Sequence, residues 1–170
     1  MEPLKNFING SFAPSRAIAT VPVICPANGQ QIALVPLSTK DDLAEAVAFG
    51  KMAFAHWSAT TIKQRAAIMF RFNYLVNQHA DELASIIMKE NGKNKAEALA
   101  DVAKGNETVE WATSLPQLAA GKVLEVSGGI ACMEQRKPLG VVAAIVPFNF
   151  PFMVSLRLCT PPEPFAHQPI

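Results

Sequence analysis

The sequence has little of what membrane proteins and nucleic-acid-binding proteins require. Its longest apolar run is far shorter than the ~18 residues of a membrane-spanning helix, and the N-terminus lacks an apolar signal core or an arginine-rich presequence. Fifteen basic residues balance 14 acidic ones without forming a basic cluster, which gives no support for a nucleic acid or an anionic membrane as a partner. We therefore predict a cytoplasmic protein with neither kind of partner.

Cysteine is also scarce. The three cysteines, Cys25, Cys132 and Cys159, share no metal-ligand spacing and cannot all pair with one another, so we expect no metal site and free thiols in a reducing compartment. Cys25 and Cys132 fall on predicted strands, where cysteine serves as a small packing residue. Cys159 precedes the sequence TPPEP, which is not the setting of a nucleophile, and we interpret it as a surplus thiol.

The most informative stretch is GVVAAIVPFNFPFM, residues 140–153. Its apolar run, residues 141–146, predicts a strand that is covered on both faces, as in a parallel α/β sheet. Pro147 and Pro151 end this strand because proline lacks an N–H and holds φ fixed. A stiff turn therefore displays residues 148–150 at the carboxyl end of the strand, where open α/β sheets bind ligands.

The pentapeptide PFNFP, from Pro147 to Pro151, resembles the P-[WF]-N-[FY]-P signature of the NAD(P)-dependent aldehyde dehydrogenases. The earlier tetrapeptide FING, residues 7–10, matches the opening of that family residue for residue, and the resemblance extends over about residues 7–154. Phe148 in the second position of the signature makes the chain look most like the CoA-acylating methylmalonate-semialdehyde dehydrogenase branch. The resemblance implies an α/β fold of which this chain is the N-terminal part.

The same resemblance implies roles for individual residues. In the family, the asparagine of the signature donates a hydrogen bond to the oxyanion of a thiohemiacetal, so Asn149 is the candidate catalytic residue. A neutral donor on a rigid turn suits this task, because one such donor is worth ~3–4 kcal/mol. The alternative for Asn149 is an ordinary turn residue that satisfies its own backbone. Ile145, Val146 and Phe148 are implied to contact NAD, Val146 through its backbone because relatives commonly have Thr, Ala or Ser there.

Periodicity and turn residues predict the remaining elements. Hairpins are expected around Asn9-Gly10, residues 26–29 and Gly128-Gly129, and helices over about residues 39–57, 61–79, 81–92 and 95–119. The residues expected to face the core are Leu43, Val47, Gly50 and Phe54 in the first helix, Ile62, Ala66, Met69, Phe72 and Val76 in the second, Leu83, Ile86 and Ile87 in the third, and Leu99, Val102 and Val109 in the fourth.

Charged residues on these helices give no sign of acid–base chemistry. Asp101 and Glu107 face different ways on their helix, while Glu107 and Glu110 have the i, i+3 spacing of a solvated face. Exposed helix carboxylates rarely have the perturbed pKa that catalysis needs. Glu90 and Lys93 belong to a segment, ENGK, that resembles the E-x-G-K helix end of the family, and we interpret both as parts of a solvated helix terminus.

The chain divides into four parts on this interpretation. The hairpin near Gly128 has one apolar face, with Leu124 and Val126, and the resemblance implies that it is an arm for homo-oligomer association. The last 16 residues hold four of the 13 prolines, so we expect a brief helix from Pro151 to about Cys159 and an extended end beyond Thr160. The parts are the hairpins and helices of the cofactor domain (1–120), the hairpin arm (121–137), the first strand and PFNFP turn of the cofactor sheet (138–154), and a divergent tail (155–170).

The motifs define the expected function. Hydride transfer from a thiohemiacetal needs a thiolate, a general base and a dinucleotide pocket, yet the family's G-Q-x-C motif and glycine turn are not found in these 170 residues. We therefore expect the N-terminal fragment of an NAD-dependent (methyl)malonate-semialdehyde dehydrogenase, from a truncated or frame-shifted gene, that is inactive alone. The alternatives are a succinate-semialdehyde or betaine-aldehyde type of dehydrogenase, or a non-catalytic product.

Overall fold

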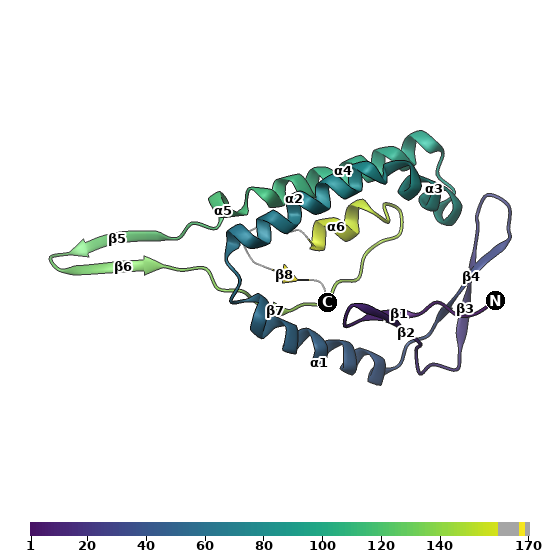
Figure 1. The fold of residues 1–170 in the computed structure, drawn as a ribbon, viewed down its shortest axis with the longest axis horizontal. Coiled ribbons are helices and arrows are strands. Elements are labelled where there is room, and N and C mark those ends of the chain that lie inside the picture. The colour runs from purple at the N-terminus through teal and green to yellow at the C-terminus, as the bar shows by residue number, and fades with distance from the viewer. Residues whose placement is uncertain (160–166, 169–170) are drawn as a thin grey trace.

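The structure is a computed structural model that describes residues 1–159 and 167–168. Helices α2, α3, α4 and α6 lie together in one layer, α1 runs along the opposite side, and the β5–β6 hairpin projects away from the helices (Figure 1). The elements in chain order are β1 (Asn6–Ile8), β2 (Ser11–Ala13), β3 (Thr20–Ile24), β4 (Gln31–Pro36), α1 (Lys40–Trp57), α2 (Ile62–Gln78), α3 (Ala80–Asn91), α4 (Lys95–Thr113), α5 (Leu115–Leu118), β5 (Lys122–Ser127), β6 (Ile130–Glu134), β7 (Gly140–Val141), α6 (Met153–Cys159) and β8 (His167–Gln168).

Three antiparallel hairpins form where their turn residues predict them. The turn of β1–β2 has positive φ at both central residues, 53° at Asn9 and 73° at Gly10, as a two-residue hairpin of this twist requires. Cys25 is buried directly after β3, as expected of a packing residue. Cys132 is exposed on β6, so its prediction as a packing residue is wrong, because the β5–β6 hairpin stands away from the helices and is exposed on both faces.

Side-chain caps set the helix starts. Thr39 and Thr61 each form a reciprocal capping box, with Asp42 and Gln64 respectively, and the Asn94 side chain accepts a hydrogen bond from the first turn of α4. Gly92 ends α3 with φ 78°, the left-handed stop that the sequence predicts. These local signals explain why the first three helix boundaries agree with the sequence prediction to within about two residues.

The fourth helix is shorter than predicted. α4 ends at Thr113, and a separate short helix, α5, follows after Ser114. Pro116 is the reason, because a proline inside a helix removes one hydrogen bond and its ring collides with the carbonyl four residues earlier. The chain therefore turns at Ser114 and leads into the β5–β6 hairpin.

The hydrophobic core lies between α2, α3 and α4. It contains residues of all three helices, and Phe72, Leu83, Leu99 and Phe152 pack around it. Ile86 of α3 is 46% exposed, contrary to prediction, because Ala84 and Ile87 are the residues of α3 that face the core. Leu43 of α1 is also exposed, because α1 packs mainly against β7 and not against the helical layer. The buried residues of the cluster are Val76, Ala84, Ile87, Ala98 and Val102.

The predicted strand over residues 141–146 is correct only at its beginning. β7 contains Gly140 and Val141 and pairs in parallel with β8, whereas residues 142–146 have no regular secondary structure. A strand needs a neighbouring backbone to accept its hydrogen bonds, and no described strand pairs with residues 142–146. The short helix expected near Cys159 is present as α6, and the expectation for residues 160–166 and 169–170 lies outside the described residues.

None of the helices that the structure describes is long and apolar enough to span a membrane.

Candidate functional site

The PFNFP segment forms a turn that leads directly into α6. Residues 148–152 are in turn or bend conformation, between the irregular segment after β7 and the start of α6 at Met153. Phe148 is 57% exposed, Phe150 is 41% exposed, and Asn149 between them is exposed as well. The Asn149 side chain makes no hydrogen bond with any described residue, so its N–H groups are available to a ligand.

The helical layer holds the backbone on both sides of Asn149. The side-chain amide of Asn91, the last residue of α3, donates a 2.8 Å hydrogen bond to the carbonyl of Phe148. The Nζ of Lys93 lies 4.0 Å from the centroid of the Phe150 ring, a cation–π contact. The carboxylate of Asp101 on α4 accepts a 2.9 Å hydrogen bond from the backbone N–H of Met153.

Asp101 and Lys93 form an ion pair, which corrects the sequence interpretation of both. Lys93 Nζ lies 3.1 Å from Asp101 Oδ2, with the Asp101 side chain fully buried and that of Lys93 only 13% exposed. Neither residue belongs to a solvated surface. A buried carboxylate must be paired and hydrogen-bonded, and Asp101 uses both oxygens, one for the ammonium group and one for the N–H of Met153. Glu107 and Glu110 are exposed, as expected.

Sequence reasoning missed Asn91 and Asp101 because their partners are distant in the chain. Asn91 and Phe148 are separated by 57 residues, and Asp101 and Met153 by 52. The only local signal was the ENGK segment, which places an amide and an ammonium group at the end of one helix. Helical periodicity carries no information about a partner 50 residues away.

The three residues predicted to contact a cofactor lie just before the turn or in it. Ile145 is fully exposed and Val146 is 37% exposed, on the irregular segment that runs into Phe148. The structure thus presents three apolar side chains next to one unpaired amide. Such a surface suits a planar aromatic ring, which prefers apolar contacts with a few polar groups at its edge.

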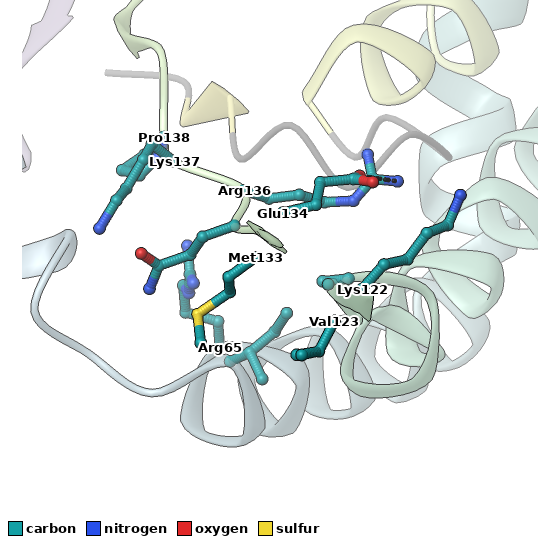
Figure 2. A pocket seen from close by; sticks show the side chains of 12 residues that line it. Arg65, Lys122, Val123, Met133, Glu134, Arg136, Lys137 and Pro138 are labelled. Atoms are coloured by element: carbon teal, nitrogen blue, oxygen red, sulfur yellow. Dashed lines mark ion pairs between the residues drawn. The ribbon is translucent and has the colours of Figure 1, made fainter. Parts of the chain in front are cut away.

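A separate cavity lies at the base of the β5–β6 hairpin, where it joins α2 and α5. It has a volume of about 470 Å³ and is lined by four basic side chains and Glu134, which approaches Arg136 to 3.9 Å (Figure 2). The predicted site residues are not among those that line it. The basic residues are Arg65, Lys122, Arg136 and Lys137.

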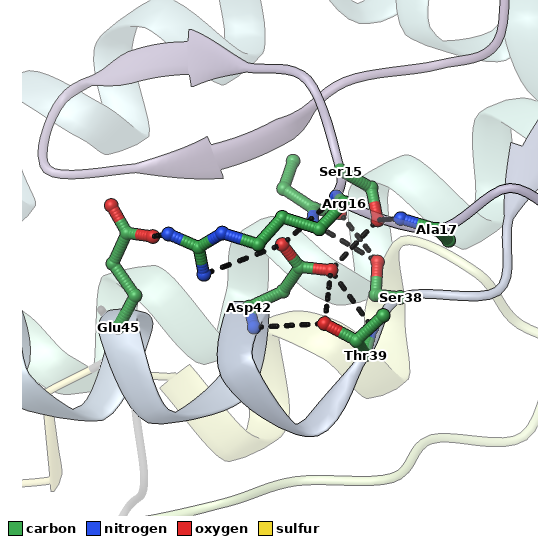
Figure 3. Close-up of polar contacts among 8 residues, drawn as sticks. Ser15, Arg16, Ala17, Ser38, Thr39, Asp42 and Glu45 are labelled. Atoms are coloured by element: carbon green, nitrogen blue, oxygen red, sulfur yellow. Dashed lines mark hydrogen bonds and ion pairs between the residues drawn. The ribbon is translucent and has the colours of Figure 1, made fainter.

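A second polar cluster joins the loop after β2 to the start of α1. Asp42, buried in the first turn of α1, accepts hydrogen bonds from the Thr39 N–H at 2.8 Å and from the Ser15 hydroxyl at 2.8 Å (Figure 3). The backbone N–H of Arg16 donates to its other oxygen at 3.1 Å. These donors, the Thr39 N–H foremost, lower the pKa of Asp42 from 3.8 to about 2. The cluster is structural and lies apart from the PFNFP turn.

Comparison with known proteins assigns the sequence to a family. A family model described as "Aldehyde dehydrogenase family" matches residues 12–162. Malonate-semialdehyde dehydrogenase 1 of Geobacillus kaustophilus is 46% identical over 154 residues, which is 90% of this chain and 32% of that protein. This chain therefore spans about a third of the length of the curated relatives that it matches.

Solved structures share the fold. A protein of Sinorhizobium meliloti 1021, assigned as a methylmalonate-semialdehyde dehydrogenase and complexed with NAD, superposes with a TM-score of 0.91 at 33% identity, covering 95% of this chain and 33% of that one. Methylmalonate-semialdehyde dehydrogenase of Oceanimonas doudoroffii gives a TM-score of 0.89 at 35% identity, covering 93% of this chain and 32% of that one.

Proposed function

Because the chain belongs to the aldehyde dehydrogenase family, we propose that it forms the N-terminal part of an NAD-dependent (methyl)malonate-semialdehyde dehydrogenase. The reaction would oxidise a semialdehyde to a thioester on a cysteine and then transfer the acyl group to CoA. Relatives named malonate-semialdehyde dehydrogenase, 42% to 46% identical to this chain, support this substrate class.

The observation that carries the proposal is the exposed, unpaired amide of Asn149 on a turn with an anchored backbone. A cysteine thiolate adds to the aldehyde carbon, a C–S bond forms, and the carbonyl electron pair moves onto oxygen. The Asn149 N–H then donates to that oxyanion. Because the turn is already fixed, the donor needs no reorganisation as the charge develops. The carbonyl re-forms when hydride leaves the same carbon, which gives the thioester.

The residues before Asn149 fit a nicotinamide cofactor. Ile145, Val146 and Phe148 present exposed apolar surface that can pack against a planar ring. When bound, NAD supplies the acceptor for the hydride. The side chains of these three residues contribute contact with the ring and exclusion of water.

We further propose that these 170 residues have no dehydrogenase activity by themselves. They contain neither the G-Q-x-C motif nor a glycine turn at a helix start. A succinate-semialdehyde or betaine-aldehyde type of dehydrogenase is the alternative within the family, and a non-catalytic product is the alternative outside it. The free thiols Cys25 and Cys132 are in keeping with a reducing, cytoplasmic location.

A hybrid enzyme tests the substrate class. It joins residues 1–154 of this chain to the part of the Geobacillus kaustophilus relative that follows the matched segment. With NAD and CoA, we expect it to form acyl-CoA from malonate semialdehyde in preference to succinate semialdehyde or betaine aldehyde. A preference for either other aldehyde, relative to the parent Geobacillus enzyme, would overturn the assignment. Turnover by the isolated 170-residue chain would overturn the proposal that it is inactive.

A further inference from the structure

We propose that Asn91, Lys93 and Asp101 are positioning residues, which fix the backbone around Asn149 and so direct its side-chain amide. The catalytic meaning of this positioning depends on the proposed function. The structural claim does not, because it concerns the conformation of the turn alone.

The two prolines of the turn cannot fix Asn149 by themselves. Pro147 and Pro151 restrict their own φ angles, and Pro151 also restricts Phe150 before it, but neither proline fixes the dihedral angles of Phe148 and Asn149. The direction of the Asn149 side chain depends on the peptide unit that joins it to Phe148. Asn91 binds the carbonyl of that peptide at 2.8 Å, which restricts its rotation.

Lys93 acts on the other side of Asn149. Its ammonium group lies over the Phe150 ring at 4.0 Å and is itself held by Asp101 at 3.1 Å. A lysine side chain has several free torsions, and a buried carboxylate removes that freedom because the two charges attract strongly where water is excluded. The ring of Phe150 is therefore packed against a fixed cation, and this contact opposes rotation of the Phe150 backbone.

Asp101 also fixes the exit of the turn. Its second oxygen accepts the N–H of Met153, the first residue of α6, as a capping residue would. Gly105, one turn farther along α4, lets α6 approach closely, because a Cβ atom there would lie 2.6 Å from Cδ1 of Phe152. Three contacts therefore hold the chain around Asn149. Asn91 binds Phe148 before it, Lys93 contacts Phe150 after it, and Asp101 binds Met153 at the start of α6.

NMR spectroscopy of the 170-residue chain, labelled with ¹⁵N-asparagine, tests the proposal. The side-chain NH₂ signal of Asn149 is identified by its loss in Asn149→Asp. We expect Asn91→Ala and Lys93→Met each to move this signal toward the shifts of an unstructured peptide, and Lys93→Arg to retain most of the parent shift because a cation remains. A separate amide-exchange measurement should show the Met153 N–H exchanging at least about tenfold faster in Asp101→Asn.

Glu107→Gln is the matched control, since Glu107 is an exposed carboxylate on the same helix that pairs only with Lys104 among the described residues. Glu107→Gln should change neither the Asn149 side-chain signal nor the exchange rate of the Met153 N–H. If Asp101→Asn does not fold, as judged by circular dichroism, Asn91→Ala and the Lys93 pair decide the outcome. The proposal is wrong if Asn91→Ala and Lys93→Met leave the Asn149 signal as unchanged as the control does.

The result separates this inference from the proposed function. An unchanged Asn149 signal refutes the positioning role, whatever the hybrid enzyme does with malonate semialdehyde. A changed signal, together with a hybrid enzyme that does not need Asn149, keeps the positioning role and refutes the proposed catalytic one.

Discussion

Asp42 joins the loop after β2 to the start of α1. Its two oxygens accept hydrogen bonds from Thr39, Ser15 and the backbone of Arg16, which lie on segments far apart in the sequence (Figure 3). All of these donors favour the charged carboxylate, and for that reason the pKa of Asp42 falls to about 2.

A pH dependence of stability follows from this shift. Because the pKa is lower in the folded chain than its ordinary value of 3.8, Asp42 contributes stability above about pH 3.8 that is lost as the pH falls toward 2. Asp42→Asn should lower the melting temperature at pH 7 and make it less sensitive to pH between 4 and 2 than in the parent. Thermal melts followed by circular dichroism across this range provide the measurement. Equal pH slopes for parent and variant would contradict the assignment.

The sequence predicts Asn149 as a site residue but does not predict the residues that hold it. The PFNFP pentapeptide and its similarity to a known signature identify Asn149 as a candidate from the sequence alone. The ion pair of Lys93 and Asp101 was not predicted, because Lys93 follows the end of α3, a position that is usually solvated, and Asp101 gives no sign of burial in the helical pattern of α4. Asp101 is buried because α6 packs against α4, and this contact joins segments that are far apart in the sequence.

At the scale of elements, Gly105 marks the contact between α4 and α6. A Cβ at this position would lie 3.2 Å from a Leu156 side-chain atom and closer still to the Phe152 ring, so these side chains or the helices have to shift. Alanine is favoured over glycine inside a helix by about 1 kcal/mol, but overpacking costs about 1–3 kcal/mol.

We therefore expect Gly105→Ala to lower the free energy of unfolding by about 1 kcal/mol, in spite of its better helix propensity. Urea denaturation measures this difference. Ala103→Gly, at an exposed position of the same helix, is the control for propensity and should destabilise by about 1 kcal/mol. A more stable Gly105→Ala chain would show that α6 does not pack against α4 as described.

The β5–β6 hairpin is the element that we expect to mediate association. Leu124 is 64% exposed and Val126 is 51% exposed on one face, as the sequence predicts. The opposite face is apolar as well, since Val123 pairs with Met133 and both are exposed, which the sequence interpretation overlooked. An apolar ribbon with two open edges is unstable in water unless something covers it.

We predict that the chain self-associates through this hairpin. Light scattering after size-exclusion chromatography should give a mass above 18.3 kDa for the parent and a mass near that value for Leu124→Lys/Val126→Lys. Ser127→Lys, which adds a charge beside the turn, serves as the control. A monomeric parent, or a double variant that associates like the parent, would argue against the arm.

The sequence predicts the helix starts and hairpin turns correctly, but it does not predict the extent of the strand after Leu139. Helix starts depend on residues three positions apart, such as Thr39 and Asp42, and two-residue turns depend on neighbours such as Asn9 and Gly10. Local sequence is sufficient for both. The strand expected over residues 141–146 needs a parallel partner from elsewhere, and among the described residues only β8 pairs with it, at Val141.

At the scale of the whole molecule, stability is concentrated in one layer. α4 packs against α2, α3 and α6 and contains the fully buried side chains of Val102 and Val109. α1 has mainly β7 beside it, and the hairpins make few contacts with the helices. A region with many buried apolar contacts opens at a higher free energy than one with few.

We expect hydrogen exchange to show this hierarchy. Backbone amides in the middle of α4 should exchange at least about tenfold more slowly than those in the middle of α1, with α2 close to α4. Native-state exchange followed by mass spectrometry resolves the two helices, and their similar lengths of 19 and 18 residues make them a matched pair. Equal protection would mean that the chain folds as one cooperative unit.

The proposed reaction depends on Asn149 donating a hydrogen bond to an oxyanion. In the hybrid enzyme, Asn149→Ala should lower kcat for malonate semialdehyde by about 10²–10³-fold with little change in KM, because the hydrogen bond strengthens only as the charge develops. Asn77→Ala, an exposed asparagine on α2, should leave kcat unchanged. An Asn149→Ala hybrid that retains the parent kcat to within about twofold would contradict the central claim.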